Sequence, residues 1–375
     1  MQLMRGIALL AFVAATFVAS STAEAYPQFQ FSTDNSKCTL CHFSPAGGGL
    51  ITEWGRDESA DTISRGGNGE FLYGLWETPD WLNLGADYRG ALGVHDTESP
   101  GFDPLAFPMQ ADIYSRFKFG DISWNMTVGL VGAARPRSPP LYSRLASREH
   151  YLMWQPKSTG TYVRAGRFYA PYGLRQVDMT SYIRRDLGYY KLEETYNLSY
   201  GYLKDDWETH ITAYTRDPLL LKVGPEGSGF AAMYEKRFRE DTAAYGAQTK
   251  VHLGPNSNRY WGGGVFKMWF ESLDLLLLAE GNIGVQKIRS QSADPIVQGV
   301  GHINLTRFIT TGVMLGTTLE VAQTDFSLKG KDRESASLHL QYFPRSHWEV
   351  MLIGRAERTR QTRDFLSLLM LHYYL

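Results

Sequence analysis

Apolar and polar residues alternate along most of the chain that follows Trp81. Between Leu82 and Val94 the even-numbered positions are mostly apolar, whereas Asn83, Asp87 and Arg89 occupy odd-numbered ones. Successive side chains of a β-strand point to opposite faces, so this pattern predicts strands with one apolar and one polar face. The same alternation occupies residues 110–119, 122–130, 207–216, 242–253 and 335–342.

The length of these runs indicates what kind of sheet they form. They span about 9–14 residues, whereas strands of globular proteins have ~5–6 residues and tilted membrane strands ~9–11. Turn-forming residues separate them at 217–218, 254–256, 329–332 and 344–346. About 14–16 such runs fit into residues 76–375. We therefore predict an all-β fold, a transmembrane antiparallel β-barrel of about 14–16 strands.

Two further features bear on this barrel. Phe365, Leu369, Leu371, Tyr373 and Leu375 alternate up to the last residue. This resembles the terminal strand of bacterial outer-membrane proteins, although a buried C-terminal strand of a soluble sheet has the same pattern. Five tryptophans are candidates for the aromatic girdles of a membrane barrel: Trp124, Trp207, Trp261, Trp269 and Trp348.

Composition excludes several classes of protein. The chain has 375 residues, with 38 Lys and Arg against 39 Asp and Glu. This balance excludes the basic surface typical of nucleic-acid-binding proteins. Beyond the first 25 residues, no apolar run approaches the ~20 residues of a membrane helix. The mixed charges on the polar faces suit a water-filled lumen without strong ion preference.

The first 25 residues have the features of a secretory signal. Arg5 provides the positive start, residues 6–19 the apolar run, and Ala23-Glu24-Ala25 a small-x-small cleavage site. A membrane anchor is the alternative, but the apolar run is short and ends in serines and a threonine. We predict cleavage before Tyr26 and export from the cytoplasm.

The two cysteines of the chain lie in the segment Cys38-Thr39-Leu40-Cys41-His42. C-x-x-C-H is the attachment motif of c-type haem. Two thiols at this spacing reach the two vinyl groups of one porphyrin, and the adjacent histidine ligates the iron. We predict one covalent haem c, attached at Cys38 and Cys41 with His42 as axial ligand. A redox-active cysteine pair, half of a zinc site and a small structural disulfide are the alternatives.

Residues 26–75 form the predicted haem-binding segment. Gly47-Gly48-Gly49 and nearby prolines and glycines indicate a loop-like peptide that wraps the haem without a core of its own. The second axial ligand is left open between His95, Met109, a lumen histidine, a residue of a partner and none. His210, His252 and His339 lie on polar faces, where a solvated side chain is the simpler interpretation.

One stretch departs from regular alternation. Residues 166–175 are followed by Arg184-Arg185-Asp186 and Glu193-Glu194, which suggests a strand that leads into a long loop. A loop folded into the lumen, lining a constriction with Arg and Glu, and a solvated outer loop are both consistent with this sequence.

Taken together, these residues resemble a porin-like bacterial outer-membrane barrel with an N-terminal monohaem c-type motif. The segment from Cys38 to Gly49 fits C-x-x-C-H-x-x-P-x-G-G-G, which is similar to the start of predicted porin-like proteins of proteobacteria. A more distant likeness is to the barrel component of porin–cytochrome conduits, which move electrons across the outer membrane. This resemblance implies an outer-membrane location, with the haem segment in the periplasm or the lumen.

Two functions follow as expectations. The first is electron transfer at or across the outer membrane, with periplasmic or extracellular c-type cytochromes as partners. The second is a porin or substrate channel in which the haem peptide is a plug or redox-sensitive gate. No G-x-S-x-G elbow, Walker loop or H-E-x-x-H motif occurs, so we expect an electron carrier or channel rather than an enzyme, with outer-membrane lipid around it and no nucleic acid.

Overall fold

The computed structural model describes residues 27–31, 37–97, 101–130, 145–176, 178, 180–189, 193–216, 226–289, 294–330 and 332–375. The predicted signal segment, residues 1–25, lies outside these ranges. No helix among the described residues is long and apolar enough to cross a membrane.

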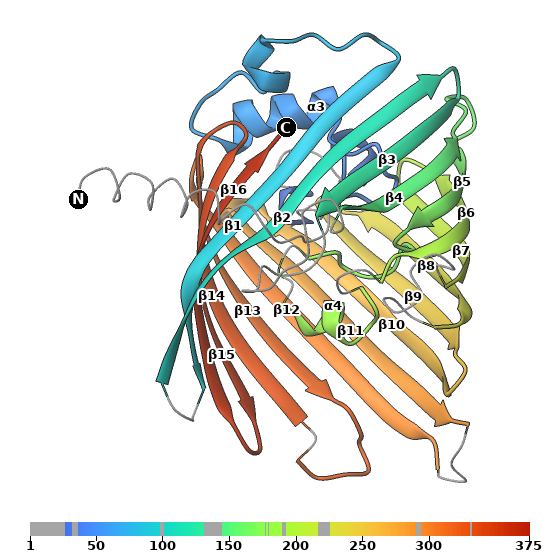
Figure 1. The fold of residues 1–375 in the computed structure, drawn as a ribbon, viewed down its shortest axis with the longest axis vertical. Helices are drawn as coiled ribbons and strands as arrows, with labels where there is room; N and C mark the ends of the chain where they lie inside the picture. Colours follow the sequence, from blue (N-terminus) through green and yellow to red (C-terminus); the bar gives the residue numbers. More distant parts are fainter. Residues whose placement is uncertain are drawn as a thin grey trace, which may run out of the picture.

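Sixteen strands form one closed antiparallel barrel, each paired with its neighbours in the sequence (Figure 1). β1 and β16 close it, with Gly90 opposite Leu371. The sequence-based prediction of a barrel of about 14–16 strands is therefore confirmed. The strands are β1 Leu82–Thr97, β2 Gly101–Phe119, β3 Ile122–Leu130, β4 Leu145–Trp154, β5 Thr161–Phe168, β6 Thr195–Leu203, β7 Trp207–Thr215, β8 Ser228–Phe238, β9 Ala243–Leu253, β10 Ser257–Phe270, β11 Leu275–Ile288, β12 Ile296–Thr310, β13 Val313–Gln323, β14 Asp332–Arg345, β15 Trp348–Thr359 and β16 Arg363–Tyr374.

The two ends of the barrel differ. Connections after the even-numbered strands are all short, whereas those at the opposite end include residues 131–144, 169–194 and 216–227. β1 starts and β16 ends at the short-turn end, where the C-terminus also lies (Figure 1). We call the two ends the short-turn end and the loop end.

The alternation of the sequence is also the alternation between lumen and exterior. On β13, Met314, Thr318 and Glu320 are buried, whereas the intervening Leu319 and Val321 are more than half exposed. Apolar side chains thus cover the outside of the barrel and polar ones face inward, the arrangement expected of a barrel with lipid outside and water or protein inside.

The girdle prediction holds for only part of the tryptophans. Trp124 and Trp348 are exposed on the outer face near the short turns, and Trp348 packs against Tyr373 at 4.7 Å between ring centroids. The prediction is wrong for Trp261, because its side chain is only 6% exposed and belongs to the core cluster inside the barrel. Trp269 packs against the same cluster. Both lie on the inward-facing positions of β10.

Candidate functional site

The N-terminal segment covers the lumen at the short-turn end (Figure 1). Ser346, in the turn after β14, donates its backbone N–H to Gly66 O at 2.7 Å, and Tyr73 donates its hydroxyl to Ser346 O at 2.6 Å. His347 Nε2 donates to Glu70 O at 3.0 Å. These contacts attach residues 66–73 to one of the barrel's short turns.

Short helical pieces, rather than a wholly loop-like peptide, make up this segment. They are η1 Pro27–Phe29, α2 Cys38–Cys41, α3 Glu53–Glu58, η2 Ser59–Ile63 and η3 Phe71–Gly74. α3 starts where the Thr52 side chain accepts a hydrogen bond from Gly55 N, so a sequence-local N-cap supports it. The prediction of an irregular peptide without a core of its own overlooked this cap.

A tight return of the chain fixes the helix that carries both thiols. Gly47, Gly48 and Gly49 all have positive φ, from 67° to 78°, which glycine adopts at little cost. This turn pairs His42 with Ile51. Thr52 then donates its N–H to Cys41 O at 2.9 Å. The three glycines thus hold α2 against the start of α3.

Gly55 is the point of closest approach between the two helices. A β-carbon at this position would lie 2.6 Å from Cys41 O and 2.8 Å from Cys41 Cα. Such contacts are too short for any side chain, so the absence of one lets α3 pack directly on the backbone of α2. The position of Cys41 therefore depends on a glycine fourteen residues later in the sequence.

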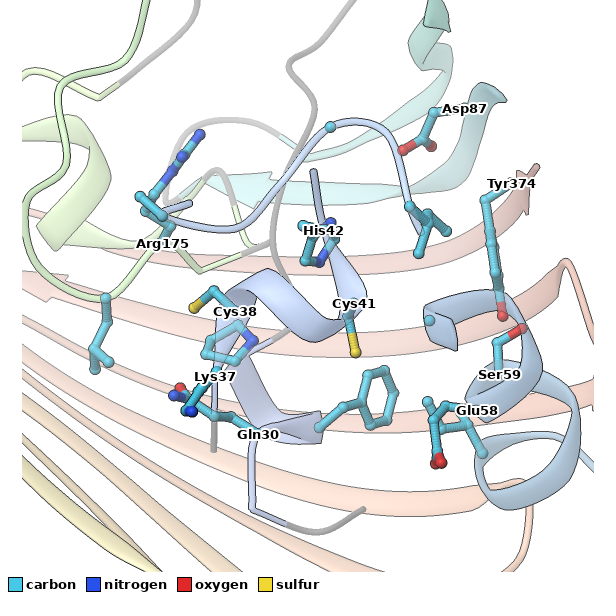
Figure 2. A pocket seen from close by; sticks show the side chains of 18 of the residues that line it. Gln30, Lys37, Cys38, Cys41, His42, Glu58, Ser59, Asp87, Arg175 and Tyr374 are labelled. Carbon is cyan, nitrogen blue, oxygen red and sulfur yellow. The ribbon is translucent and has the colours of Figure 1, made fainter. Parts of the chain in front are cut away.

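Cys38, Cys41 and His42 line one cavity inside the short-turn end of the barrel. Figure 2 shows both cysteines on the same helical turn, with Arg175 on one side of the motif and Tyr374 on the other. The space not filled by atoms amounts to about 1310 Å³ when the open side of the cavity is included. Its other walls include Phe29, Gln30, Lys37, Ile51, Ile63, Asp87, Tyr114, Tyr172, Leu174, Arg175, His210, Met233, Glu235, Lys267, Phe343, His372 and Tyr374.

Burial determines the chemical state of the cysteines and the histidine of this motif. Neither cysteine is part of a disulfide. Burial raises the pKa of the Cys38 thiol to about 12, with Glu208 adding to the effect. Burial and the nearby Arg175 lower the pKa of His42 to about 4, so its imidazole is neutral at pH 7, the form that ligates a metal. His42 Nδ1 is buried without a hydrogen-bond partner. The three predicted side chains are thus together, and the donor set and the cavity fit a haem.

His95 and Met109, two of the predicted candidates for the second axial ligand, lie away from this cavity. His95 is eight residues beyond the cavity-lining Asp87 on β1, which corresponds to about 27 Å along a strand. Met109 lines a separate cavity with His339. Neither residue lines the cavity of Cys38, Cys41 and His42, because the position along a strand, not the nearness in sequence to Cys38, decides which residue reaches it.

Among the three lumen histidines named from the sequence, only His210 lines the cavity of the haem motif. His252 lines a cavity near the loop end. The structure adds His372 and Met233, which the sequence reasoning missed. A signal for Met233 was present in the sequence: on β8 it shares the inward face with Glu235 and Arg237, where an apolar residue is unexpected.

The connection between β5 and β6 folds into the lumen. Its helix α4, Tyr182–Arg185, lies inside the barrel wall (Figure 1). Glu320 of β13 accepts hydrogen bonds from Ser181 Oγ at 2.5 Å and from Tyr182 N at 2.9 Å, and Glu280 of β11 accepts one from Leu174 N at 2.6 Å. Of the two arrangements considered for this stretch, the structure has the lumen loop. We call residues 169–189 the lumen loop.

Tyrosines of the lumen loop connect the cavity of the haem motif with a second cavity toward the loop end. Tyr172 lines the first cavity and stacks on Tyr189, with ring centroids 5.8 Å apart and planes at 16°. Tyr189 lines the second cavity, together with Tyr169, whose centroid is 6.0 Å away. Lys250 Nζ lies 4.2 Å from the centre of the Tyr189 ring. A continuous aromatic contact therefore runs between the two cavities.

No family model matches this sequence, and no curated protein matches it. Solved structures do. OmpT of Vibrio cholerae, an outer membrane protein, superposes with a TM-score of 0.59 at 11% identity over 78% of this chain and 99% of that one. The chain has the fold of the outer-membrane porins.

Two further structures have the same similarity. The outer membrane channel DcaP of Acinetobacter baumannii gives a TM-score of 0.57 at 11% identity, over 78% of this chain and 97% of that one. An anion-selective porin from Comamonas acidovorans gives 0.58 at 6% identity, over 78% and 99%. These likenesses concern the barrel architecture.

Proposed function

We propose that this protein is an outer-membrane barrel that carries one covalently bound c-type haem in its lumen and transfers electrons at or across the outer membrane. One observation supports this most directly: Cys38, Cys41 and His42 line a single cavity enclosed by the barrel. The apolar outer face of the barrel is the surface that lipid requires.

The residues of the motif have distinct roles. The Sγ atoms of Cys38 and Cys41 would hold the porphyrin through thioether bonds, and the neutral imidazole of His42 would hold the iron. When bound, the haem would supply reversible one-electron chemistry. Apolar wall residues such as Ile51, Ile63 and Phe343 would help to exclude water from the cavity.

The position of the cavity indicates the side of the membrane from which the haem would be reached. In outer-membrane barrels the short turns face the periplasm, so a haem at the short-turn end is accessible to periplasmic c-type cytochromes. One haem does not span the apolar band of ~25 Å. The contact from Tyr172 to Tyr189 extends the electronic coupling from the haem cavity toward the loop end, where an acceptor or donor outside the cell can approach.

Covalent haem is tested with the full chain produced in cells that attach haem c. The wild-type protein should retain haem on a denaturing gel and show the absorption spectrum of a c-type cytochrome. Cys41→Ala should lose covalent haem but still give a heat-modifiable band, because strand pairing does not need the porphyrin. A colourless wild-type protein contradicts the proposal, and a Cys41→Ala chain that fails to assemble contradicts the separation of haem and barrel.

A channel is the second candidate function, and the lumen loop is the observation that favours it. The porin fold and polar inward faces suit passage of solutes, and the N-terminal segment with the lumen loop is placed to act as a plug. Planar-bilayer conductance separates the two functions. A wide, steady conductance that is independent of haem reduction favours an open channel, and a conductance that changes on reduction favours a redox-sensitive gate.

A further inference from the structure

One apolar side chain, Met233, lies on the part of the lumen wall that lines the cavity of the haem motif. The inward face of β8 carries Ala231, Met233, Glu235 and Arg237, all buried. The barrel register places Met233 between His210 of β7 and Gln248 of β9. Met233 is 8% exposed and lines the cavity that contains the haem motif. Met233 is thus flanked on the neighbouring strands by polar side chains.

The two sides of the haem motif face different parts of the lumen. Cys38 lies within electrostatic range of Glu235 and Lys267, which are on β8 and β10. His42 instead lies near Arg175 and Gly49, in the lumen loop and the N-terminal segment. A porphyrin held by Cys38 and Cys41 would therefore lie between the lumen loop, the side from which His42 approaches, and the wall formed by β8 and β10.

His210 is the first competing ligand on this wall, and its ring is already engaged. Nδ1 lies 2.7 Å from the Tyr162 hydroxyl and Nε2 lies 3.3 Å from Glu208 Oε1. His210 is 1% exposed. Turning its ring toward an iron would break both contacts and leave the buried Glu208 paired with Arg237, at 3.0 Å, and losing part of a buried charge network is costly in a protein interior.

His372 is engaged in the same way. Nδ1 lies 2.9 Å from Glu349 Oε2 and Nε2 lies 2.6 Å from Asp87 Oδ1. The ammonium of Lys267 pairs with Glu235 at 2.7 Å and donates to Gln30 at 2.8 Å. These groups belong to buried polar networks that already satisfy them.

Met233 differs from these groups because it would not have to give up a hydrogen bond or an ion pair in order to bind a metal. A thioether is a weak hydrogen-bond acceptor that needs no partner when buried, and it has a free lone pair. Soft sulfur ligands suit haem iron, and methionine opposite histidine is an established ligand pair for it. Coordination requires no proton transfer and breaks no bond.

We propose that the thioether sulfur of Met233 is the second axial ligand of the haem held by Cys38, Cys41 and His42. This inference rests on the proposed function. It makes the haem a bridge between the N-terminal segment and the barrel wall, because the two axial ligands come from different parts of the fold. It also predicts a higher reduction potential than two histidine ligands would give, because methionine raises the potential.

The test is the spectrum of purified, haem-loaded full-length protein. Ferric wild-type protein should be low-spin and show the weak far-red absorption band of sulfur-ligated haem. Met233→Leu removes the sulfur at nearly constant volume, so it should lose that band, become high-spin and keep its covalent haem. Met233→His should return to low spin without the band and with a lower midpoint potential than the wild type.

Met351→Leu is the matched control. Met351 is inward-facing on β15 and 6% exposed, but it lines the other cavity, together with Met109. Its substitution should leave the spectrum unchanged. If Met233→Leu fails to assemble into a heat-modifiable barrel, Met233→His still decides, because persistence of the far-red band in that variant overturns the proposal.

The outcomes distinguish this inference from the function on which it rests. Covalent haem with no far-red band in the wild type, or with an unchanged band in Met233→Leu, overturns the role of Met233 and leaves the haem protein intact. Wild-type protein without covalent haem overturns the proposed function and this inference with it, and a haem-stained denaturing gel reveals that case before any spectrum is compared.

Discussion

Arg175 Nη1 donates a hydrogen bond to the backbone carbonyl of Gly47 at 3.0 Å. The donor belongs to the lumen loop and the acceptor to the glycine turn that follows the haem motif, 128 residues earlier in the chain. This contact joins two segments that enter the lumen from opposite ends of the barrel. Movement of either segment is therefore expected to affect the other.

Arg175→Met should loosen the glycine turn without removing the aliphatic part of the side chain. A hydrogen bond from a charged group contributes about 1.5–3 kcal/mol, so the local free energy of opening should fall by roughly 1–2 kcal/mol. Amide hydrogen exchange in residues 43–51 should accelerate about tenfold, since 1.4 kcal/mol corresponds to a factor of ten. Arg216→Met changes an exposed arginine at the end of β7 and should leave this exchange unchanged. Equal exchange in both variants would show that the contact does not hold the turn.

Gly55→Ala should reduce the attachment of haem. The added β-carbon meets Cys41 O at 2.6 Å, so α2 must shift relative to α3 and the thiols move with it. Alanine otherwise favours a helix over glycine by about 1 kcal/mol, so lower haem content cannot come from helix propensity. Gly66→Ala is the control, because no heavy atom lies within 4 Å of its added carbon. The measurement is haem per barrel on stained gels, and equal content in the two variants contradicts the prediction.

Glu320→Gln should release the lumen loop from β13. Glu320 Oε2 pairs with Arg355 at 2.8 Å, and both side chains are almost fully buried. Loss of one charge from a buried pair costs about 3–5 kcal/mol, and the hydrogen bonds to Ser181 and Tyr182 weaken at the same time. Trypsin should then cut after Arg185 faster than in the wild type. The control is Glu334→Gln, which removes the partner of exposed Arg358 at 2.7 Å. Such an exposed pair contributes at most about 1 kcal/mol, so cleavage of this variant should stay slow. Similar cleavage of both variants would argue against Glu320 as the anchor of the lumen loop.

Tyr189→Leu should slow electron exchange between the haem and an oxidant at the loop end. The substitution removes the ring that stacks on Tyr172, and a gap in packed contact weakens electronic coupling. Cells that contain the reduced protein are mixed with ferricyanide, and haem oxidation is followed by absorbance. Tyr245→Leu changes an exposed tyrosine on the outer face of β9 and should leave the rate unchanged. If the haem of Tyr189→Leu is oxidised as fast as that of the control, the contact between Tyr172 and Tyr189 has no role in electron transfer.

The sequence by itself determined the barrel, the number of strands to within two, and the spacing of Cys38, Cys41 and His42 from which a haem site is predicted. Strand alternation is a local property, since each residue's face depends only on its parity along the strand. The spacing of Cys38, Cys41 and His42 is equally local. Both can therefore be recognised in a single sequence without knowledge of distant contacts.

Only the tertiary structure decided which residues meet inside the lumen. His95 is closer to Cys38 in sequence than Met233 is, yet it lies too far along β1 to reach the cavity, whereas Met233 lines it. The tyrosine contact between Tyr172 and Tyr189 likewise depends on how the lumen loop folds back. Which side chains come into contact in the lumen depends on strand register and on the strand tilt that closes the barrel. Register and tilt follow from all the strands together.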